Sequence, residues 1–237
     1  MIRGRRIVVT SVAAGVALAC SALLAPVALA VPRTESMSDG LALLKARDHL
    51  AIQRRLDVLA ALTRRVDAAI HLAASDRSTL LSQYSAADGG LRALDEKIQS
   101  DSTVAAVRAD QTRIVTDYHV YVLVVPKTHI VIAADRISYI ASEFASLVSK
   151  LQAAIDEAKA DEKNTTAAQN AFDDMQAKVQ DAMNVTAGIP GRVLPLEASG
   201  YPDNRSTLLG ARSDLVTART DLRAARADVV KVIQALS

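Results

Sequence analysis

Residues 126–158 carry an apolar residue at alternating steps of four and three, and this feature limits most what the chain can fold into. Side chains three or four places apart share one face of a helix, so the spacing predicts a long amphipathic helix. Further apolar residues widen the stripe onto a second face, which places this helix in the middle of a bundle. The stripe is Ile130, Ala134, Ile137, Ala141, Phe144, Val148, Leu151, Ile155 and Ala158, widened by Val131, Ile132, Ile140 and Leu147.

The same spacing recurs in five other segments. It predicts helices over about residues 41–74, 76–100, 104–125, 165–186 and 204–236, in addition to the central one. Residues 187–204 hold three glycines and three prolines, so we expect the one long loop there. The predicted fold class is all-α: an elongated helical bundle, or antiparallel coiled coil, of about six helices.

Residues 119–134 allow a second interpretation. They are dense in β-branched side chains on both sides of Pro126, a composition that also describes a β-hairpin. Pro126 equally fits the first turn of the central helix, where no backbone N–H is required. The helix is favoured because the apolar spacing continues well beyond both ends of this stretch, and the hairpin stays open as the alternative.

The first thirty residues have the layout of a secretory signal peptide: three arginines, an apolar run, and the ending Ala28-Leu29-Ala30. Cleavage after Ala30 leaves residues 31–40 as a polar leader and residues 41–237 as a single helical domain. The protein is then secreted or held at the cell envelope. The alternatives are a retained membrane anchor and lipidation of Cys20, although the residues before Cys20 only faintly match a lipoprotein box.

Removal of the signal also changes the charge balance. Three of the 28 basic residues lie within it, which leaves 25 basic against 26 acidic residues. This balance gives no electrostatic reason to expect nucleic acid or an anionic membrane as the partner. Cys20 is the only cysteine, so the mature protein would lack disulfides and would be stabilised by packing.

A seven-residue unit occurs three times in the last predicted helix, as Ala-Arg-x-Asp-Leu or Val at residues 211–215, 218–222 and 225–229. With the apolar residues at heptad positions a and d, arginine occupies e and aspartate g, the positions that select a partner helix. Residues 156–181 contain seven acids and three lysines, whereas residues 205–231 contain six basic residues and three acids. These opposite charges predict that the helix at 165–186 packs beside the last helix.

No set of residues points to a catalytic, cofactor-binding or metal site. His49, His71, His119 and His129 each lack a second ligand three or four places later in the chain, the spacing expected of a helical metal site. Glycine-rich phosphate loops and nucleophile motifs are also missing from the sequence. We therefore expect neither a cofactor nor enzymatic activity.

Two other features have both functional and purely structural interpretations. Gly89-Gly90 lies inside a predicted helix, at a cost of about 1 kcal/mol per glycine relative to alanine, and indicates a kink, a hinge or a close crossing of another helix. The doubled arginines Arg54-Arg55 and Arg64-Arg65 could recognise a phosphate or an acidic surface. The simpler interpretation is a solvated helix face on which nearby aspartates screen the positive charge.

Residues 116–127, Thr-Asp-Tyr-His-Val-Tyr-Val-Leu-Val-Val-Pro-Lys, resemble a segment of uncharacterised exported helical proteins from high-GC Gram-positive bacteria. The resemblance extends over much of the chain after residue 30. Those proteins have no established activity, so the resemblance implies export and a helical fold and assigns no role to any residue.

These observations together predict an exported, non-enzymatic helical bundle. We expect it to act as a scaffold or to bind a protein partner at the cell envelope or outside the cell, or to self-associate through its coiled-coil faces. The alternative is a small-ligand-binding protein or enzyme with a pocket near Gly89-Gly90 or residues 187–204. A membrane is a partner only if the signal is retained or Cys20 is lipidated.

The export prediction has a direct test in the intact mass of the secreted protein. We expect a chain that begins at Val31, because the apolar run and the Ala28-Leu29-Ala30 ending match signal-peptidase processing. A mature chain that begins at Cys20 and carries added lipid would contradict it.

Overall fold

The computed structural model describes residues 33–237, and nearly all of them are helical. Within this part of the chain no strand occurs, so the predicted all-α class is confirmed. The predicted signal peptide, residues 1–30, lies outside the described residues. The elements are α1 (Arg33–Asp67), α2 (Ala74–Ser100), α3 (Val104–Thr116), a π-helical turn (Val120–Val124), α4 (Val125–Ala160), α5 (Thr166–Ala187), α6 (Ile189–Val193), a 3-10 turn (Ala198–Gly200) and α7 (Asn204–Leu236).

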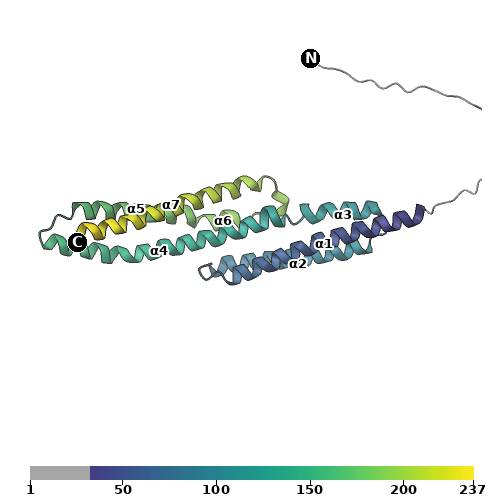
Figure 1. The fold of residues 1–237 in the computed structure, drawn as a ribbon, viewed down its shortest axis with the longest axis horizontal. Coiled ribbons are helices and arrows are strands. Elements are labelled where there is room, and N and C mark those ends of the chain that lie inside the picture. The colour runs from purple at the N-terminus through teal and green to yellow at the C-terminus, as the bar shows by residue number, and fades with distance from the viewer. Residues whose placement is uncertain (1–32) are drawn as a thin grey trace, which may run out of the picture.

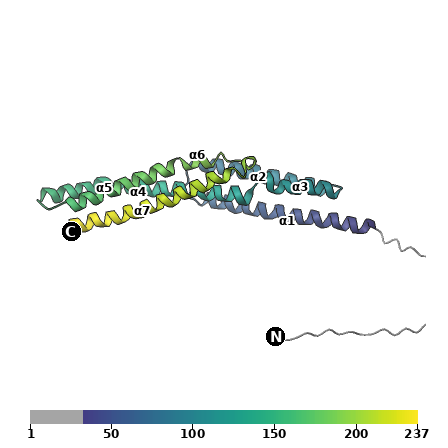
Figure 2. The same cartoon turned by 90° about the horizontal axis from the view of Figure 1, so that it is seen from above.

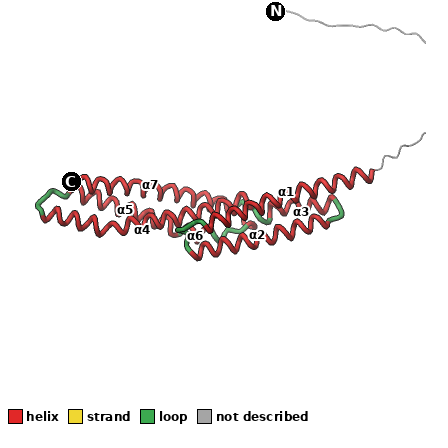
Figure 3. The backbone as a smooth tube through the Cα atoms, turned by 60° about the horizontal axis from the view of Figure 1, so that its bottom comes forward, coloured by secondary structure: helices red, strands yellow, loops and turns green. Residues whose placement is uncertain are grey.

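The long helices form two bundles that follow one another along an elongated molecule (Figure 1). Helices α1, α2 and α3 pack together in the N-terminal bundle, and α4, α5 and α7 pack together in the C-terminal bundle. Contacts of α4 with α1 join the two, and Figure 2 shows the same arrangement from above. The loops lie at the helix ends (Figure 3). One antiparallel coiled coil of six helices is therefore not confirmed.

Helix α4 buries the predicted apolar stripe most completely in its first half. Buried members of the stripe are Ile130, Ala134, Ile137, Ala141, Ile155 and Ala158. The second face of α4 differs along its length: Val131 is fully buried, Ile140 is half-buried and Leu147 is exposed. The predicted cover on more than one side is thus present only near the start of α4, and the rest of the second face is open.

Helices α5 and α7 pack side by side, as predicted. On α7 the contact is made by leucines alternating with alanines, and Ala211, Ala218 and Ala225 are fully buried. The charges act differently from the prediction, because Lys178 of α5 pairs with Asp228 of α7 and the α7 arginines make no ion pair with α5 within the described chain. Apolar packing, and not attraction between an acidic and a basic helix, joins this pair.

Helix α1 ends at Asp67, earlier than predicted, because Arg77 of α2 caps its C-terminal end. The Arg77 guanidinium donates hydrogen bonds to the carbonyl oxygens of Val66, Asp67 at 3.1 Å and Ala69 at 2.7 Å. Carbonyls at a helix end have no partner within the helix, and a cation there is favourable. At its other end α1 already begins at Arg33, so residues 33–40 of the predicted polar leader are helical.

The predicted helix over residues 104–125 is interrupted. Helix α3 ends at Thr116, and His119 adopts a left-handed backbone conformation with φ of 40° before the π-helical turn begins. The π-helical turn leads directly into α4, which has Pro126 in its first turn. The hairpin alternative for residues 119–134 is therefore wrong. The spacing of apolar residues continues through the break, which is why the sequence pattern did not reveal it.

Gly89 and Gly90 lie inside the continuous helix α2, and they differ in their surroundings. A methyl group at Gly90 would lie 2.6 Å from Oη and 2.9 Å from Cε1 of Tyr118, whereas nothing lies within 4 Å of one at Gly89. Gly90 therefore marks a close approach of a side chain, and not the close crossing of another helix that the sequence suggested. The approaching group is the Tyr118 side chain, just beyond the end of α3.

These two glycines form a matched pair for a stability test. We expect Gly89→Ala to raise the free energy of unfolding by about 0.5–1 kcal/mol, since alanine loses less backbone entropy in a helix. Gly90→Ala should not raise the free energy of unfolding, because the Tyr118 ring must move to make room for the methyl group. Urea unfolding of both variants measures the difference. Equal stabilisation would show that the Tyr118 contact carries no energetic weight.

Candidate functional site

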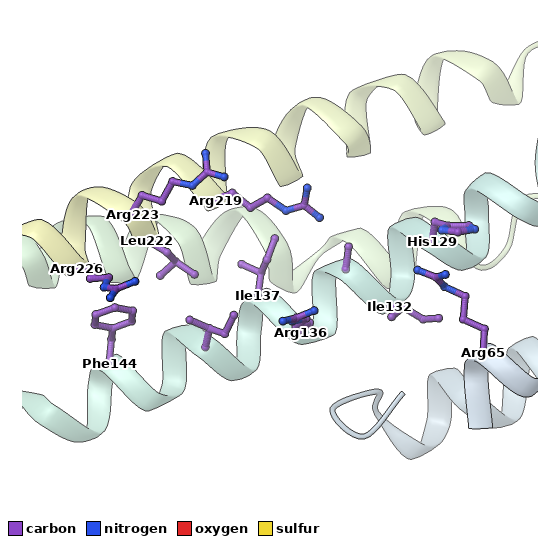
Figure 4. A pocket seen from close by; sticks show the side chains of 12 residues that line it. Arg65, His129, Ile132, Arg136, Ile137, Phe144, Arg219, Leu222, Arg223 and Arg226 are labelled. Atoms are coloured by element: carbon purple, nitrogen blue, oxygen red, sulfur yellow. The ribbon is translucent and has the colours of Figure 1, made fainter. Parts of the chain in front are cut away.

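A groove runs between α4 and α7 on the side facing away from α5, and its widest part is a cavity of about 590 Å³. Figure 4 shows the side chains that line this part, from α4, α7 and the end of α1. Six of the lining residues are basic and six are apolar. The basic ones are Arg65, His129, Arg136, Arg219, Arg223 and Arg226, and the apolar ones are Ile132, Ala133, Ile137, Ile140, Phe144 and Leu222.

The groove continues towards the start of α7 through two adjoining cavities. The first, of about 400 Å³, shares His129, Ala133 and Arg219 with the widest part. The second, of about 560 Å³, shares Pro126 and Arg212 with the first. We call these three cavities together the α4–α7 groove. None of the side chains that line it is acidic.

Four arginines of α7 follow the groove at intervals of seven residues. These are Arg205, Arg212, Arg219 and Arg226, which we call the arginine row, and all four are exposed. Two further arginines, Arg136 and Arg223, lie among them. None of these six guanidinium groups lies within 4.0 Å of an aspartate or glutamate in the part of the chain that the structure describes. Their charge is therefore not neutralised within residues 33–237.

The aspartates of the same heptads lie on the opposite flank of α7, and two of the three, Asp214 and Asp228, are paired. Asp228 is 1% exposed and accepts hydrogen bonds from Lys178 of α5 and, at 2.7 Å, from Lys231. Burial alone would raise the pKa of Asp228, but these two lysines hold it below its usual value. Asp214 accepts a hydrogen bond at 2.6 Å from Arg192 of α6. The sequence named both flanks as partner-selecting, and only the aspartate flank finds its partners within the described chain.

The N-terminal bundle contributes one side chain to the groove. Arg65 extends from α1 towards His129 of α4 (Figure 4). Burial and the positive charge of Arg65 lower the pKa of His129 below its usual 6.5, so the imidazole is neutral at pH 7. Of the doubled arginines, Arg65 thus lines a groove. Arg55 instead bonds the carbonyl oxygen of Ala51 at 2.7 Å and lies 5.2 Å from the centre of the Tyr121 ring.

A buried lysine fixes the structure next to the start of the groove. Lys127 is 4% exposed, and its ammonium group donates to Gln83 Oε1 at 3.0 Å and to the carbonyl oxygens of Leu194 at 3.1 Å and Leu196. These contacts tie α4 to α2 and to the segment after α6. Burial lowers the pKa of Lys127 to about 8, against the opposing effect of the Glu197 carboxylate.

The other residues that the sequence singled out lie apart from one another. His49 contacts Asp95 at 2.7 Å, His71 stacks on Tyr139 with ring centres 3.7 Å apart, and His119 contacts the Tyr201 ring. Within residues 33–237 no three His, Cys, Asp or Glu side chains are placed to hold a metal ion. The described cavities do not include Gly89-Gly90.

The segment 187–204 is less irregular than the sequence suggested. It contains α6 and a 3-10 turn, and Ile189 and Val193 are fully buried, so part of it packs against the bundle. Tyr201 of this segment lines the last cavity of the α4–α7 groove. The groove itself was not predicted from the sequence. The available signal was the recurrence of arginine every seven residues along one flank of the last helix.

The buried lysine predicts a specific dependence of stability on pH. Unfolded Lys127 keeps its proton up to about pH 10.5, whereas folded Lys127 releases it near pH 8. Between these values the unfolded chain binds more protons, so this residue makes the free energy of unfolding rise with pH. Urea unfolding from pH 8 to 10 should show a rise for the wild type that Lys127→Met lacks. Equal slopes would show that the three acceptors keep the ammonium charged.

None of the helices in residues 33–237 combines the length and the apolarity needed to cross a membrane. Comparison of the chain with protein-family models, curated proteins and solved structures finds no match.

Proposed function

We propose that this protein is an exported, non-enzymatic helical scaffold that binds a protein partner at the cell envelope or outside the cell, and that the α4–α7 groove is its binding surface. The coiled-coil character of the heptads in α7 is part of this proposal. One flank of the heptads pairs with α5 and α6 through Asp228 and Asp214. The other flank, the arginine row, is available to a partner.

The observation that carries the proposal is the set of arginines that lie above apolar side chains and have no acidic partner within residues 33–237. An arginine that pairs with nothing in its own chain keeps its full capacity for charge-assisted hydrogen bonds to an incoming carboxylate. Apolar groups below it supply contact area that is non-directional. Interfaces between proteins are enriched in arginine and aromatic residues, and Arg226 faces the ring of Phe144 across the groove (Figure 4).

The alternative of a small-ligand-binding protein or enzyme has weaker support. Tyr201 from segment 187–204 lines a cavity of about 560 Å³, a size that suits a small ligand. However, a small-ligand site needs polar groups that converge on one point. The arginine row instead spans 21 residues of α7, which is about 30 Å at 1.5 Å per residue. Such a spread suits an elongated partner.

A pull-down from the secreted or envelope fraction with residues 31–237 tests the proposal. We expect wild-type protein to retain a partner that the double variant Arg219→Glu and Arg226→Glu loses, because reversal replaces attraction with repulsion. The matched control is Arg54→Glu with Arg108→Glu, which makes the same charge change at exposed arginines outside the groove. Mass spectrometry identifies the retained protein.

The fold of each variant is checked by circular dichroism and thermal melting. Reversing exposed arginines should change the free energy of unfolding by less than about 1 kcal/mol, so loss of the partner would not reflect unfolding. Retention of the same partner by all three proteins, or its loss from the control variant as well, would contradict a role for the groove.

A further inference from the structure

The C-terminal bundle has an open side along the α4–α7 groove. Helix α5 packs against both α4 and α7, and among residues 33–237 the opposite side of the α4–α7 pair is covered only where α1 reaches it. Large apolar side chains are exposed on this side of α7, with Leu209 at 52% and Val216 at 62% exposure. Both line the α4–α7 groove.

These exposed apolar residues follow the same repeat as the arginines. Leu209, Val216 and Val230 belong to one seven-residue repeat, in which Arg223 occupies the remaining position. The arginine row forms a second seven-residue repeat, and Ile233 occupies its next position. The two sets are three or four residues apart from one another, so they form one continuous stripe along α7. The stripe lies next to the buried leucine and alanine face that packs on α5. Helix α7 therefore presents two faces with helical periodicity, and only one is covered within residues 33–237.

We propose that the occupant of the α4–α7 groove is an acidic amphipathic helix of a partner protein, about 20 residues long, which completes a four-helix bundle with α4, α5 and α7. This inference rests on the proposed function and specifies the chemistry of the partner. Apolar residues at a and d positions of that helix would cover Val216, Leu222 and Phe144. Aspartate or glutamate every seven residues would meet the arginine row.

The length and the charge of the groove together favour a helix. The arginine row rises about 10 Å along α7 with each member, which matches the rise of a heptad on a facing helix. The guanidinium group is a planar fork that fits a carboxylate through two hydrogen bonds, and α7 uses arginine at all four positions of the row. Glu143 lines a neighbouring cavity further along α4, so the acidic face of the partner should end before it.

Part of the apolar surface lies between the two helices and favours a helix over an anionic membrane. Leu209 and Val216 project outward, as a membrane-binding helix requires, but Ile137 and Leu222 line the groove at 4% and 7% exposure. Side chains of a third helix can reach residues between two helices more readily than a flat lipid surface can.

A designed peptide tests this proposal directly. Its blocked 21-residue helix carries leucine at a and d and glutamate on the flanks every seven residues, and binding to residues 31–237 is measured by fluorescence anisotropy. One control peptide keeps the composition and the leucines but moves the glutamates off the seven-residue spacing. A second control replaces every glutamate with lysine.

We expect the heptad peptide to bind wild-type protein at least tenfold more tightly than either control, a difference of about 1.4 kcal/mol. Arg219→Glu with Arg226→Glu should reverse the preference, so that this variant binds the lysine peptide more tightly than the glutamate peptide. This exchange of partners requires a folded protein, so it also excludes unfolding as the cause. The variant Leu209→Ser with Val216→Ser should weaken both interactions.

Several outcomes would overturn the proposal. Equal binding of the heptad and respaced peptides would show a site for polyanions in general, and binding to vesicles of anionic lipid without peptide binding would show a membrane surface. Dimers of wild-type protein in sedimentation, lost in the arginine variant, would show that a second copy fills the groove. If the peptide does not bind but the pull-down partner is still lost on arginine reversal, the proposed function stands and the helical occupant is wrong. Failure of both experiments rejects both.

Discussion

The packing of α7 against α5 through alternating leucine and alanine is the constraint on which the C-terminal bundle depends. Ala211, Ala218 and Ala225 are fully buried there, so the two backbones can approach closely. Burying a leucine contributes roughly 1.5–3 kcal/mol, and Leu208, Leu215 and Leu222 are all buried. Apolar contact therefore sets the rotation of α7 about its axis. The positions of the two charged flanks follow from this rotation.

That rotation explains why aspartates of one flank form ion pairs and the arginine row on the other flank does not. With positions a and d turned towards α5, position g faces α5 and α6, where Lys178 and Arg192 lie within ion-pairing distance. Position e then lies along the opposite edge, beside α4. The facing residues there are Ile132, Arg136 and Ile140, and none of them can neutralise a guanidinium. A single heptad pattern thus yields one flank that stabilises the bundle and one that is left for another molecule.

The N-terminal bundle matters for the groove because it is joined firmly to α4. The backbone N–H of Ala73 donates to Asp135 at 2.8 Å, and His71 stacks on Tyr139. Lys127 adds contacts to α2 and to the segment after α6. These contacts hold the end of α1 where Arg65 can reach the groove. A binding surface built mainly from α4 and α7 consequently depends on residues more than sixty positions earlier in the chain.

Some properties could be predicted from the sequence because they are local. Spacing of three and four residues determined the helical class, and it determined the buried faces of α5 and α7, whose seam residues Phe172, Met175, Leu215 and Leu222 are buried. The segment rich in glycine and proline lies between α5 and α7, as expected. A pattern repeated over several turns outweighs the preferences of single residues, which is why these predictions held.

Other properties depend on contacts between distant parts of the chain. The end of α1 at Asp67 is set by Arg77, and the close approach at Gly90 is made by Tyr118. Neither partner can be identified from spacing, because periodicity describes one helix at a time. The same reason applies to the candidate site. The sequence determined that Arg212, Arg219 and Arg226 share one flank of a helix, but only tertiary packing decided that this flank borders an open apolar groove without a carboxylate to neutralise it.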